Sequence, residues 1–209
     1  FLRFIACALE VSGAENLTAH KPMVFVMNHA SYVDAVVAMA LLPVGTCFVA
    51  KKEIFSAPLL GLLLKKIHAL SVDRLDFSKG LAVTDQIEAK LKAGHSILIF
   101  PEGTFGYAEG LRPFRLGAFK IAAETNTPIC PVAIHGTRII LRNDDTLLTP
   151  HRVRATVSAP ISPTGNEWED ITTLRNKTRA EIAANCGEPT LDYIAAQTVA
   201  PKSSEIPRT

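Results

Sequence analysis

The chain has 209 residues, 48% of them hydrophobic and 20% charged, which is typical of a globular protein with one sizeable core and excludes a disordered chain. Its net charge of +2 is too small to indicate nucleic-acid binding through bulk electrostatics. Four widely spaced cysteines with no Cys-x-x-Cys pair argue against a disulfide framework and a structural zinc site, and favour a reducing compartment.

Short apolar runs alternate with longer helix-like stretches, a pattern typical of α/β proteins. In chain order we predict a strand over 23–27, a helix over 32–42, a strand over 46–50, a helix over 57–67, a strand over 68–72, a helix over 79–93, a strand over 97–100, a helix over 116–125, strands over 129–135 and 153–158, and a helix over 171–186. This order predicts one α/β domain over 1–186 with a central, mostly parallel sheet covered by helices. The remaining residues, 187–209, are rich in Pro, Ser and charge and are predicted to be a tail or linker.

Two features bear on the setting of this domain. The chain begins at Phe1, so we expect it to be part of a longer protein. No run reaches the roughly 18 apolar residues of a membrane span. The apolar segment 57–64, followed by Lys65 and Lys66, is either a core helix with a solvated basic end or a segment that dips into a membrane interface.

Polar or charged side chains follow four of the predicted strands directly. They are His29, Arg74, Glu102 and His135. Parallel sheets bind ligands at the carboxyl ends of their strands, so this placement predicts one common site.

His29 and Asp34 are the first pair with chemical potential in this set. Histidine has an ordinary pKa of about 6.5, and a nearby carboxylate can fix its tautomer and support the imidazolium. The pair works as a base only if His29 lies in the turn after the strand and Asp34 in the first helical turn. An equally good interpretation is structural, because Ser31-x-x-Asp34 fits a capping box. The residues alone leave both open.

A second motif is Phe100-Pro101-Glu102-Gly103-Thr104, in which a strand delivers a carboxylate, a glycine that allows close backbone approach, and a hydroxyl. Such a stretch is also compatible with an ordinary polar turn.

Taken in order, these blocks resemble the glycerophospholipid acyltransferase family, whose best-known members are the 1-acylglycerol-3-phosphate acyltransferases. Asn28-His29 through Asp34 is similar to the Asn-His-x4-Asp block, and 71–74 to a strand ending in Asp-Arg. Residues 100–104 match the Phe-Pro-Glu-Gly-Thr block, and 131–134 a proline-led apolar strand. Gly13–Leu17 and Pro113–Phe119 are similar to flanking segments of the family. The resemblance covers about 13–134 and extends more weakly to 160.

The resemblance implies a glycerol-3-phosphate acyltransferase-like fold and direct acyl transfer, without an acyl-enzyme, from acyl-CoA or acyl-carrier protein to a lysophospholipid hydroxyl. It implies that His29 is the general base and Asp34 orients it. Glu102 would hold the glycerol part of the acceptor, with Gly103 and Thr104 positioning it or stabilising the oxyanion. Arg74 would bind the acceptor phosphate. No metal or cofactor is implied.

The sequence departs from the family at Phe105, where an arginine that contributes phosphate binding often stands. This puts lysophosphatidic acid in doubt as the acceptor, unless Arg112 or Arg115 compensates. The resemblance also favours a membrane-apposed surface over a plain core helix for segment 57–66, and a place at the cytoplasmic face of a membrane.

Two rival functions stay open. One is a thioesterase-like hydrolase in which the same base activates water. The other is a lipid-binding or regulatory domain with a vestigial site. Against the second stands the joint presence of five motif residues, His29, Asp34, Glu102, Gly103 and Thr104.

Overall fold

The structure is a computed structural model that describes residues 8–56, 61–62, 64, 66–67, 69–72, 77–106, 108–141 and 148–191. The predicted helix over 57–67 lies mostly outside these residues. Arg74, which we expected to bind the acceptor phosphate, lies entirely outside them.

The described residues form one seven-stranded sheet in the order β1-β7-β6-β2-β5-β3-β4. The strands are β1 (Leu9–Ser12), β2 (Val24–Met27), β3 (Cys47–Lys51), β4 (Leu70–Val72), β5 (Ile97–Ile99), β6 (Ile129–His135) and β7 (Val153–Val157). Neighbouring strands are parallel except β6 and β7. Because β1 is parallel to β7, these two strands run opposite to the other five. The mostly parallel sheet predicted from the sequence is confirmed.

The α-helices whose two ends both lie in the described residues are α1 (Val33–Leu41), α3 (Phe77–Lys92), α4 (Gly117–Glu124), α5 (Thr137–Ile140) and α6 (Trp168–Cys186). The 3-10 turns η1 (Ala14–Thr18) and η2 (Lys52–Ser56) follow β1 and β3. The predicted helices lie within three residues of the observed ones. The sequence analysis missed β1, η1 and α5. β1 is an edge strand whose residues are mostly exposed, so it carries no apolar run that would mark it.

The core lies on both faces of the sheet, and β2 shows why. Val24 and Val26 pack in the cluster that includes side chains of α3, α4 and α6. Phe25 and Met27 point to the opposite face, into the cluster that includes α1 and α5. Successive side chains of a strand alternate between faces, so a strand covered on both sides needs an unbroken apolar run. That run is what made β2 recognisable in the sequence.

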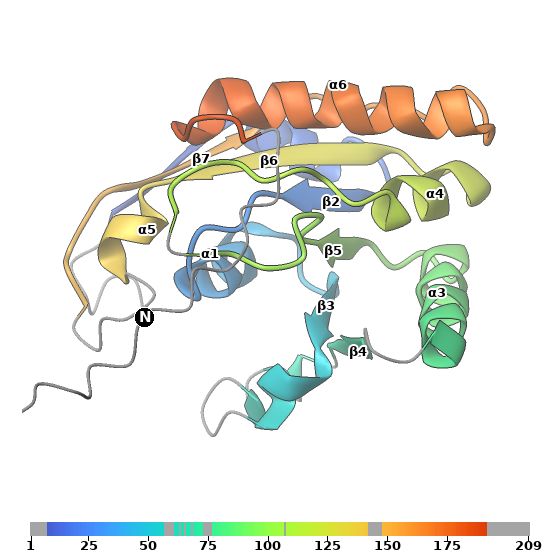
Figure 1. Ribbon diagram of the computed structural model, residues 1–209, viewed down its shortest axis with the longest axis horizontal. Coiled ribbons are helices and arrows are strands. Elements are labelled where there is room, and N and C mark those ends of the chain that lie inside the picture. Colours follow the sequence, from blue (N-terminus) through green and yellow to red (C-terminus); the bar gives the residue numbers. More distant parts are fainter. Residues whose placement is uncertain are drawn as a thin grey trace, which may run out of the picture.

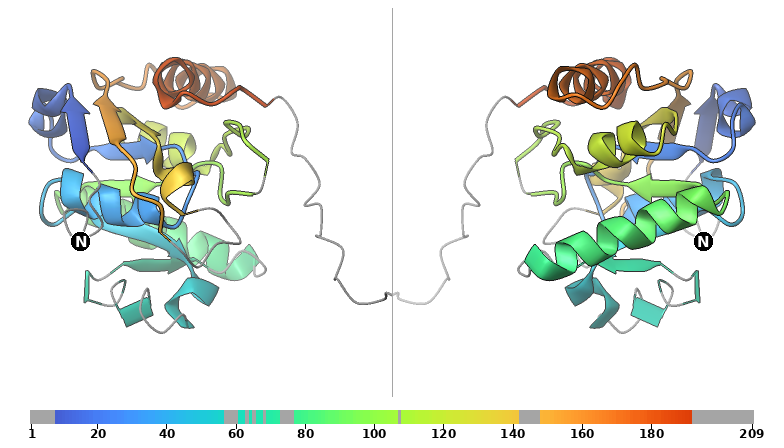
Figure 2. Two further views of the ribbon diagram at one scale, coloured as in Figure 1. Left: turned by 90° about the vertical axis from the view of Figure 1, so that its left-hand side faces the viewer. Right: turned by 90° about the vertical axis from the view of Figure 1, so that its right-hand side faces the viewer.

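Figure 1 shows α6 above β6 and β7, with β3 and β4 at the opposite side of the molecule. The two views in Figure 2, turned by 90°, keep this arrangement. The carboxyl ends of the central parallel strands β2 and β5 meet at one edge, since Val26 of β2 pairs with Ile99 of β5. The residues that follow these two strands are therefore brought together.

Candidate functional site

The site begins where Asn28 ends strand β2. Its buried side-chain amide donates to the carbonyl of Ile134 at 2.9 Å and accepts from the Ile134 N–H at 2.7 Å. Strand β2 pairs with β6 only as far as Met27 and Val132, so the Asn28 side chain binds two backbone groups of β6 beyond the end of that ladder. The side chain thus replaces the ladder and frees the backbone to turn, which places His29 just past the sheet edge.

His29 and Asp34 contact each other directly, with His29 Nδ1 2.8 Å from Asp34 Oδ2. The Asp34 side chain is fully buried and that of His29 is 15% exposed. Since a carboxylate oxygen only accepts, Nδ1 carries the hydrogen of this bond, and in the neutral form of the imidazole the lone pair is then on Nε2. The arrangement is that of a base held in one tautomer by a buried carboxylate.

The structural interpretation of Asp34 also holds, and one oxygen serves both roles. Oδ2 accepts hydrogen bonds from the backbone N–H groups of Ala30 and Ser31 at 2.6 and 2.8 Å. The Ser31 hydroxyl accepts from the Val33 N–H at 3.3 Å. Asp34 therefore closes the start of α1 and orients the imidazole at the same time. Its other oxygen, Oδ1, is buried without a hydrogen-bond partner among the described residues.

Glu102 lies in the turn after β5 and joins it to the His29 turn. Its Oε1 accepts the backbone N–H of His29 at 2.7 Å, and its Oε2 accepts that of Arg112 at 2.8 Å. The residue is 5% exposed. Burial raises the pKa of the Glu102 carboxyl to about 8, against the lowering effect of the two N–H donors, and the nearby Glu188 and Asp34 carboxylates add to the rise.

Aromatic rings enclose the base. The Phe100 ring stacks on the His29 imidazole with centroids 4.3 Å apart and planes at 26°. Phe105 approaches the same imidazole at 4.5 Å and 66°, and Phe105 in turn meets Tyr32 at 4.7 Å and 86°. The tyrosine is 48% exposed. Phe105 and Tyr32 therefore form a continuous series of ring contacts from the partly buried His29 imidazole to the surface.

The other members of the Phe100–Thr104 block form the turn itself. Gly103 has a φ of 78°, a conformation that favours glycine, and its N–H donates to the Phe100 carbonyl at 3.0 Å. The Thr104 hydroxyl donates to the Phe105 carbonyl at 3.3 Å. The Gly103 N–H and the Thr104 hydroxyl thus both donate to carbonyls of the same segment, and the hydroxyl, which can rotate about its C–O bond, is the one that can be redirected toward an oxyanion.

The two arginines that we expected near the acceptor follow this turn. Arg112 is partly buried, and its backbone is fixed by Glu102. Arg115 is exposed, and its N–H donates to the carbonyl of Pro101 at 3.0 Å. His135, expected at the same site, has its Nδ1 3.3 Å from a guanidinium nitrogen of Arg154 on β7.

A partly buried ion pair holds the loop between Phe105 and Arg112. Arg138, on α5, contacts both oxygens of Glu188 at 2.7 and 2.9 Å, and each of the two side chains is 16% exposed. The same arginine donates to the Gly106 carbonyl at 3.0 Å, while Glu188 accepts the Gly110 N–H at 2.9 Å. The pair therefore holds two points of the loop.

The backbone after α6 adds to this fastening. The N–H of Leu111 donates to the carbonyl of Pro189 at 2.8 Å, and the N–H of Leu191 donates to the carbonyl of Leu111 at 2.9 Å. Gly187, with φ 69°, turns the chain out of α6, and a side chain there would overlap the His135 ring. Residues 187–191, which we call the strap, thus begin the predicted tail but pack against the site.

The sequence analysis missed the strap and the partners of Glu102. Neither leaves a local pattern in the sequence. Glu102 accepts backbone N–H groups, which every residue except proline has, and Glu188 of the strap pairs with Arg138, which lies fifty residues earlier. Within the described part of the chain, no three His, Cys, Asp or Glu side chains gather as metal ligands. Nor is any helix described there long and apolar enough to cross a membrane.

Residues 8–135 match the family described as Acyltransferase. A 1-acyl-sn-glycerol-3-phosphate acyltransferase of Cocos nucifera is 34% identical over 148 residues, which cover 70% of this chain and 47% of that protein. The alpha form of Bos taurus is 28% identical over 173 residues, covering 82% of this chain and 60% of that protein. The chain thus spans about half the length of the first curated relatives it matches.

A solved structure with a similar fold is the crystal structure of the 1-acyl-sn-glycerophosphate (LPA) acyltransferase PlsC from Thermotoga maritima. The match has a TM-score of 0.73 at 22% identity and covers 88% of this chain and 74% of that one. The α/β fold expected from the resemblance is confirmed by this likeness.

Proposed function

Because the chain belongs to the acyltransferase family, we propose that it is an O-acyltransferase that moves a fatty acyl group from acyl-CoA or acyl-carrier protein to a hydroxyl of a lysophospholipid. The observation that carries the proposal is the His29–Asp34 pair, 2.8 Å apart, at the carboxyl end of β2. The names of the two relatives described above, both 1-acyl-sn-glycerol-3-phosphate acyltransferases, support a lysophospholipid acceptor. The thioester is the only co-substrate required.

In the first step the acceptor hydroxyl binds with its oxygen about 3 Å from His29 Nε2. As this oxygen attacks the thioester carbonyl carbon, Nε2 takes its proton and the carbonyl becomes an oxyanion. Asp34 supports the positive charge that forms on the imidazole, because its carboxylate is buried against Nδ1. The Thr104 hydroxyl is our candidate donor to the oxyanion.

In the second step the tetrahedral intermediate collapses. The C–S bond breaks, the thiolate leaves, and it takes back the proton held at Nε2. The products are an oxygen ester and a free thiol, so the base returns to its starting state. No acyl-enzyme is formed in this sequence.

The remaining residues have supporting roles in the proposal. Glu102 keeps the base in place through the His29 backbone, and contact with the acceptor glycerol is a further proposed role. Arg74, Arg112 and Arg115 supply positive charge for an acceptor phosphate, since guanidinium groups match phosphate geometry. We also propose that the domain works at a membrane surface, at its cytoplasmic face, because both lipid substrates partition there.

The test uses the purified chain, an acyl-CoA or acyl-carrier-protein donor, and lysophospholipid acceptors. Thiol release should depend on the acceptor and be matched by formation of the diacyl product. His29→Ala should abolish it. His95→Ala should not, because His95 is exposed and lies before the amino end of β5, whereas the site lies after its carboxyl end.

Two results would replace the proposal. Thiol release that needs no acceptor would make the protein a hydrolase in which His29 activates water. Lipid binding that persists in His29→Ala, with no release from any donor in the unaltered chain, would make it a lipid-binding domain.

A further inference from the structure

Among the described residues, Asp34 contacts one ring nitrogen of His29, Nδ1, which leaves Nε2 for the acceptor. Asp34 holds Nδ1, Phe100 stacks on one side of the ring at 4.3 Å, and Phe105 approaches it at 4.5 Å. An acceptor hydroxyl must therefore reach Nε2 along a surface that is partly aromatic.

The rings of Phe105 and Tyr32 are nearly perpendicular, so together they form a corner, which we call the aromatic corner. Their rings lie 4.7 Å apart with planes at 86°, so each presents a different ring surface to the space beside the base. They come from separate segments, since Tyr32 precedes α1 and Phe105 follows the turn after β5. Phe105 is partly buried and Tyr32 is half exposed, so the corner opens to solvent.

The size of the acceptor brings it into contact with this corner. Its hydroxyl oxygen must lie about 3 Å from Nε2. The Phe105 centroid is only 4.5 Å from the imidazole centroid. The carbons next to the reacting hydroxyl, and the group attached to them, can therefore contact the Phe105 ring.

Ring faces carry partial negative charge and donate no hydrogen bond, so they are poor neighbours for an anion. A phosphomonoester, with close to two negative charges at neutral pH, loses more hydration against these ring faces than a singly charged phosphate does, and the ring faces return no hydrogen bond. A phosphodiester carries one charge, and the alcohol attached to it offers apolar groups, or an ammonium, that an aromatic corner binds well.

We propose that Phe105 and Tyr32 form an acceptor subsite that selects lysophospholipids whose phosphate is a diester over those with a phosphomonoester. The inference rests on the proposed acyl transfer and deepens it by naming the acceptor class. Phe105 sets the selectivity, because of these two rings it is the one that contacts the His29 imidazole. Tyr32 extends the contact surface toward the lipid headgroup.

The experiment compares kcat/KM for three acceptors with the same acyl chain: lysophosphatidate, lysophosphatidylglycerol and lysophosphatidylcholine. In the unaltered chain both diesters should exceed the monoester by roughly tenfold or more, equivalent to about 1.4 kcal/mol. Phe105→Arg should shift the ratio toward lysophosphatidate by about tenfold, because a guanidinium pairs with the monoester. Phe105→Leu is the control for size and should keep the diester preference.

Tyr32→Ala separates contact with the headgroup from a merely structural effect. It should raise KM for the diesters about threefold or more while kcat is retained, since Tyr32 touches no reacting atom. A preference of the unaltered chain for lysophosphatidate would overturn the subsite, as would a ratio unchanged in Phe105→Arg. Acyl transfer to none of the three would overturn the proposed function as well, so the two failures are distinguishable.

Discussion

Glu102 Oε1 accepts the backbone N–H of His29 at 2.7 Å, so the carboxyl of the Glu-Gly-Thr turn holds the chain segment that carries the His29 imidazole. Its second oxygen fixes Arg112 in the same way. A residue expected from the sequence to face the substrate therefore also connects two loops. This contact leads to the first two predictions.

Glu102→Gln should lower kcat by about one to two orders of magnitude with a smaller change in the acceptor KM, because the amide replaces one of the two acceptors with a donor. One backbone N–H would then face an NH2 group, and the free energy of unfolding should fall by about 1–3 kcal/mol. Steady-state kinetics and chemical denaturation measure the two effects. Glu109→Gln, an exposed glutamate in the same loop, is the matched control. A rise in KM with kcat intact would show instead that Glu102 acts by binding the acceptor.

The raised pKa of Glu102 predicts a pH-dependent contribution to stability. The pKa is about 8 in the folded chain, above the ordinary 4.5, so the native state binds a proton that the unfolded state has lost. This contribution is complete below the unfolded pKa and is lost as pH rises through the folded one. Thermal unfolding from pH 4.5 to 8.5 should therefore show a fall in Tm that is smaller in Glu102→Gln. An identical pH profile in the two proteins would contradict the prediction.

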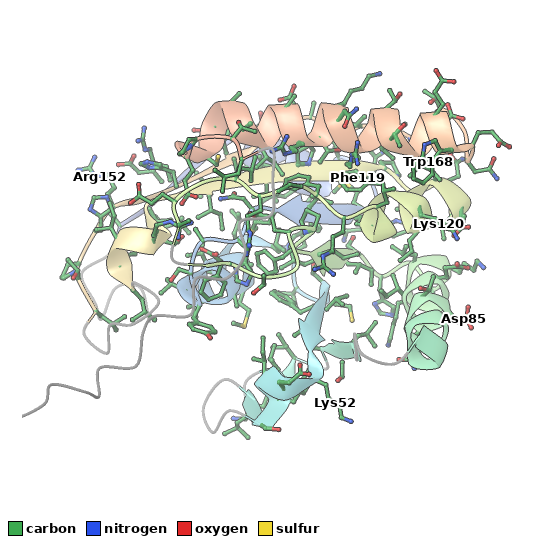
Figure 3. The ribbon with its side chains drawn as sticks, viewed as in Figure 1. Lys52, Asp85, Phe119, Lys120, Arg152 and Trp168 are labelled. Carbon is green, nitrogen blue, oxygen red and sulfur yellow. The ribbon has the colours of Figure 1, made fainter. Side chains whose placement is uncertain are left out.

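Asp34→Asn should separate the two roles of Asp34. The Asn carbonyl oxygen can still accept the Ala30 and Ser31 N–H groups, so the start of α1 should survive with a loss of about 1 kcal/mol. The imidazole loses its carboxylate, and acyl transfer should fall by on the order of 10²–10⁴-fold. Activity and unfolding of the same preparation measure both. Asp85→Asn is the control, because Asp85 lies on the outer side of α3, away from α1 (Figure 3). Equal losses of activity in both variants would argue against a role at the base.

Glu188→Gln should loosen the loop that carries Phe105. The change removes the charge facing Arg138, and because the pair is 16% exposed on each side we expect a loss of about 2 kcal/mol in unfolding free energy. Protease cleavage within 103–112 should become faster, and kcat should fall. Glu181→Gln, an exposed glutamate on α6, should change neither. Unaltered cleavage in Glu188→Gln would show that the strap holds the loop without the ion pair.

Much of the fold was predictable because the strands and helices of the core have apolar patterns within a few neighbouring residues. The run Val24–Met27 is apolar at every position, and α4 and β6 begin and end within a residue of their predicted bounds. The placement of His29 and Glu102 followed from one rule, that polar residues after parallel strands meet at the same sheet edge. The exposed edge strand β1 and the short helix α5 were missed because each has only four residues, too few to show the hydrophobic periodicity of a strand or a helix.

By itself the sequence determined which segments are buried, where strands give way to turns, and which polar residues stand at those turns. Such properties depend on neighbours within a few positions. Only the tertiary structure decided that β1 and β7 run against the other strands, that Glu102 binds two backbone N–H groups, and that 187–191 pack as a strap against the loop before Arg112. Each of these pairs residues far apart in the chain. The packing of the whole domain selects their partners. The residues next to a backbone N–H or a carboxylate in the sequence do not specify which distant group it will contact.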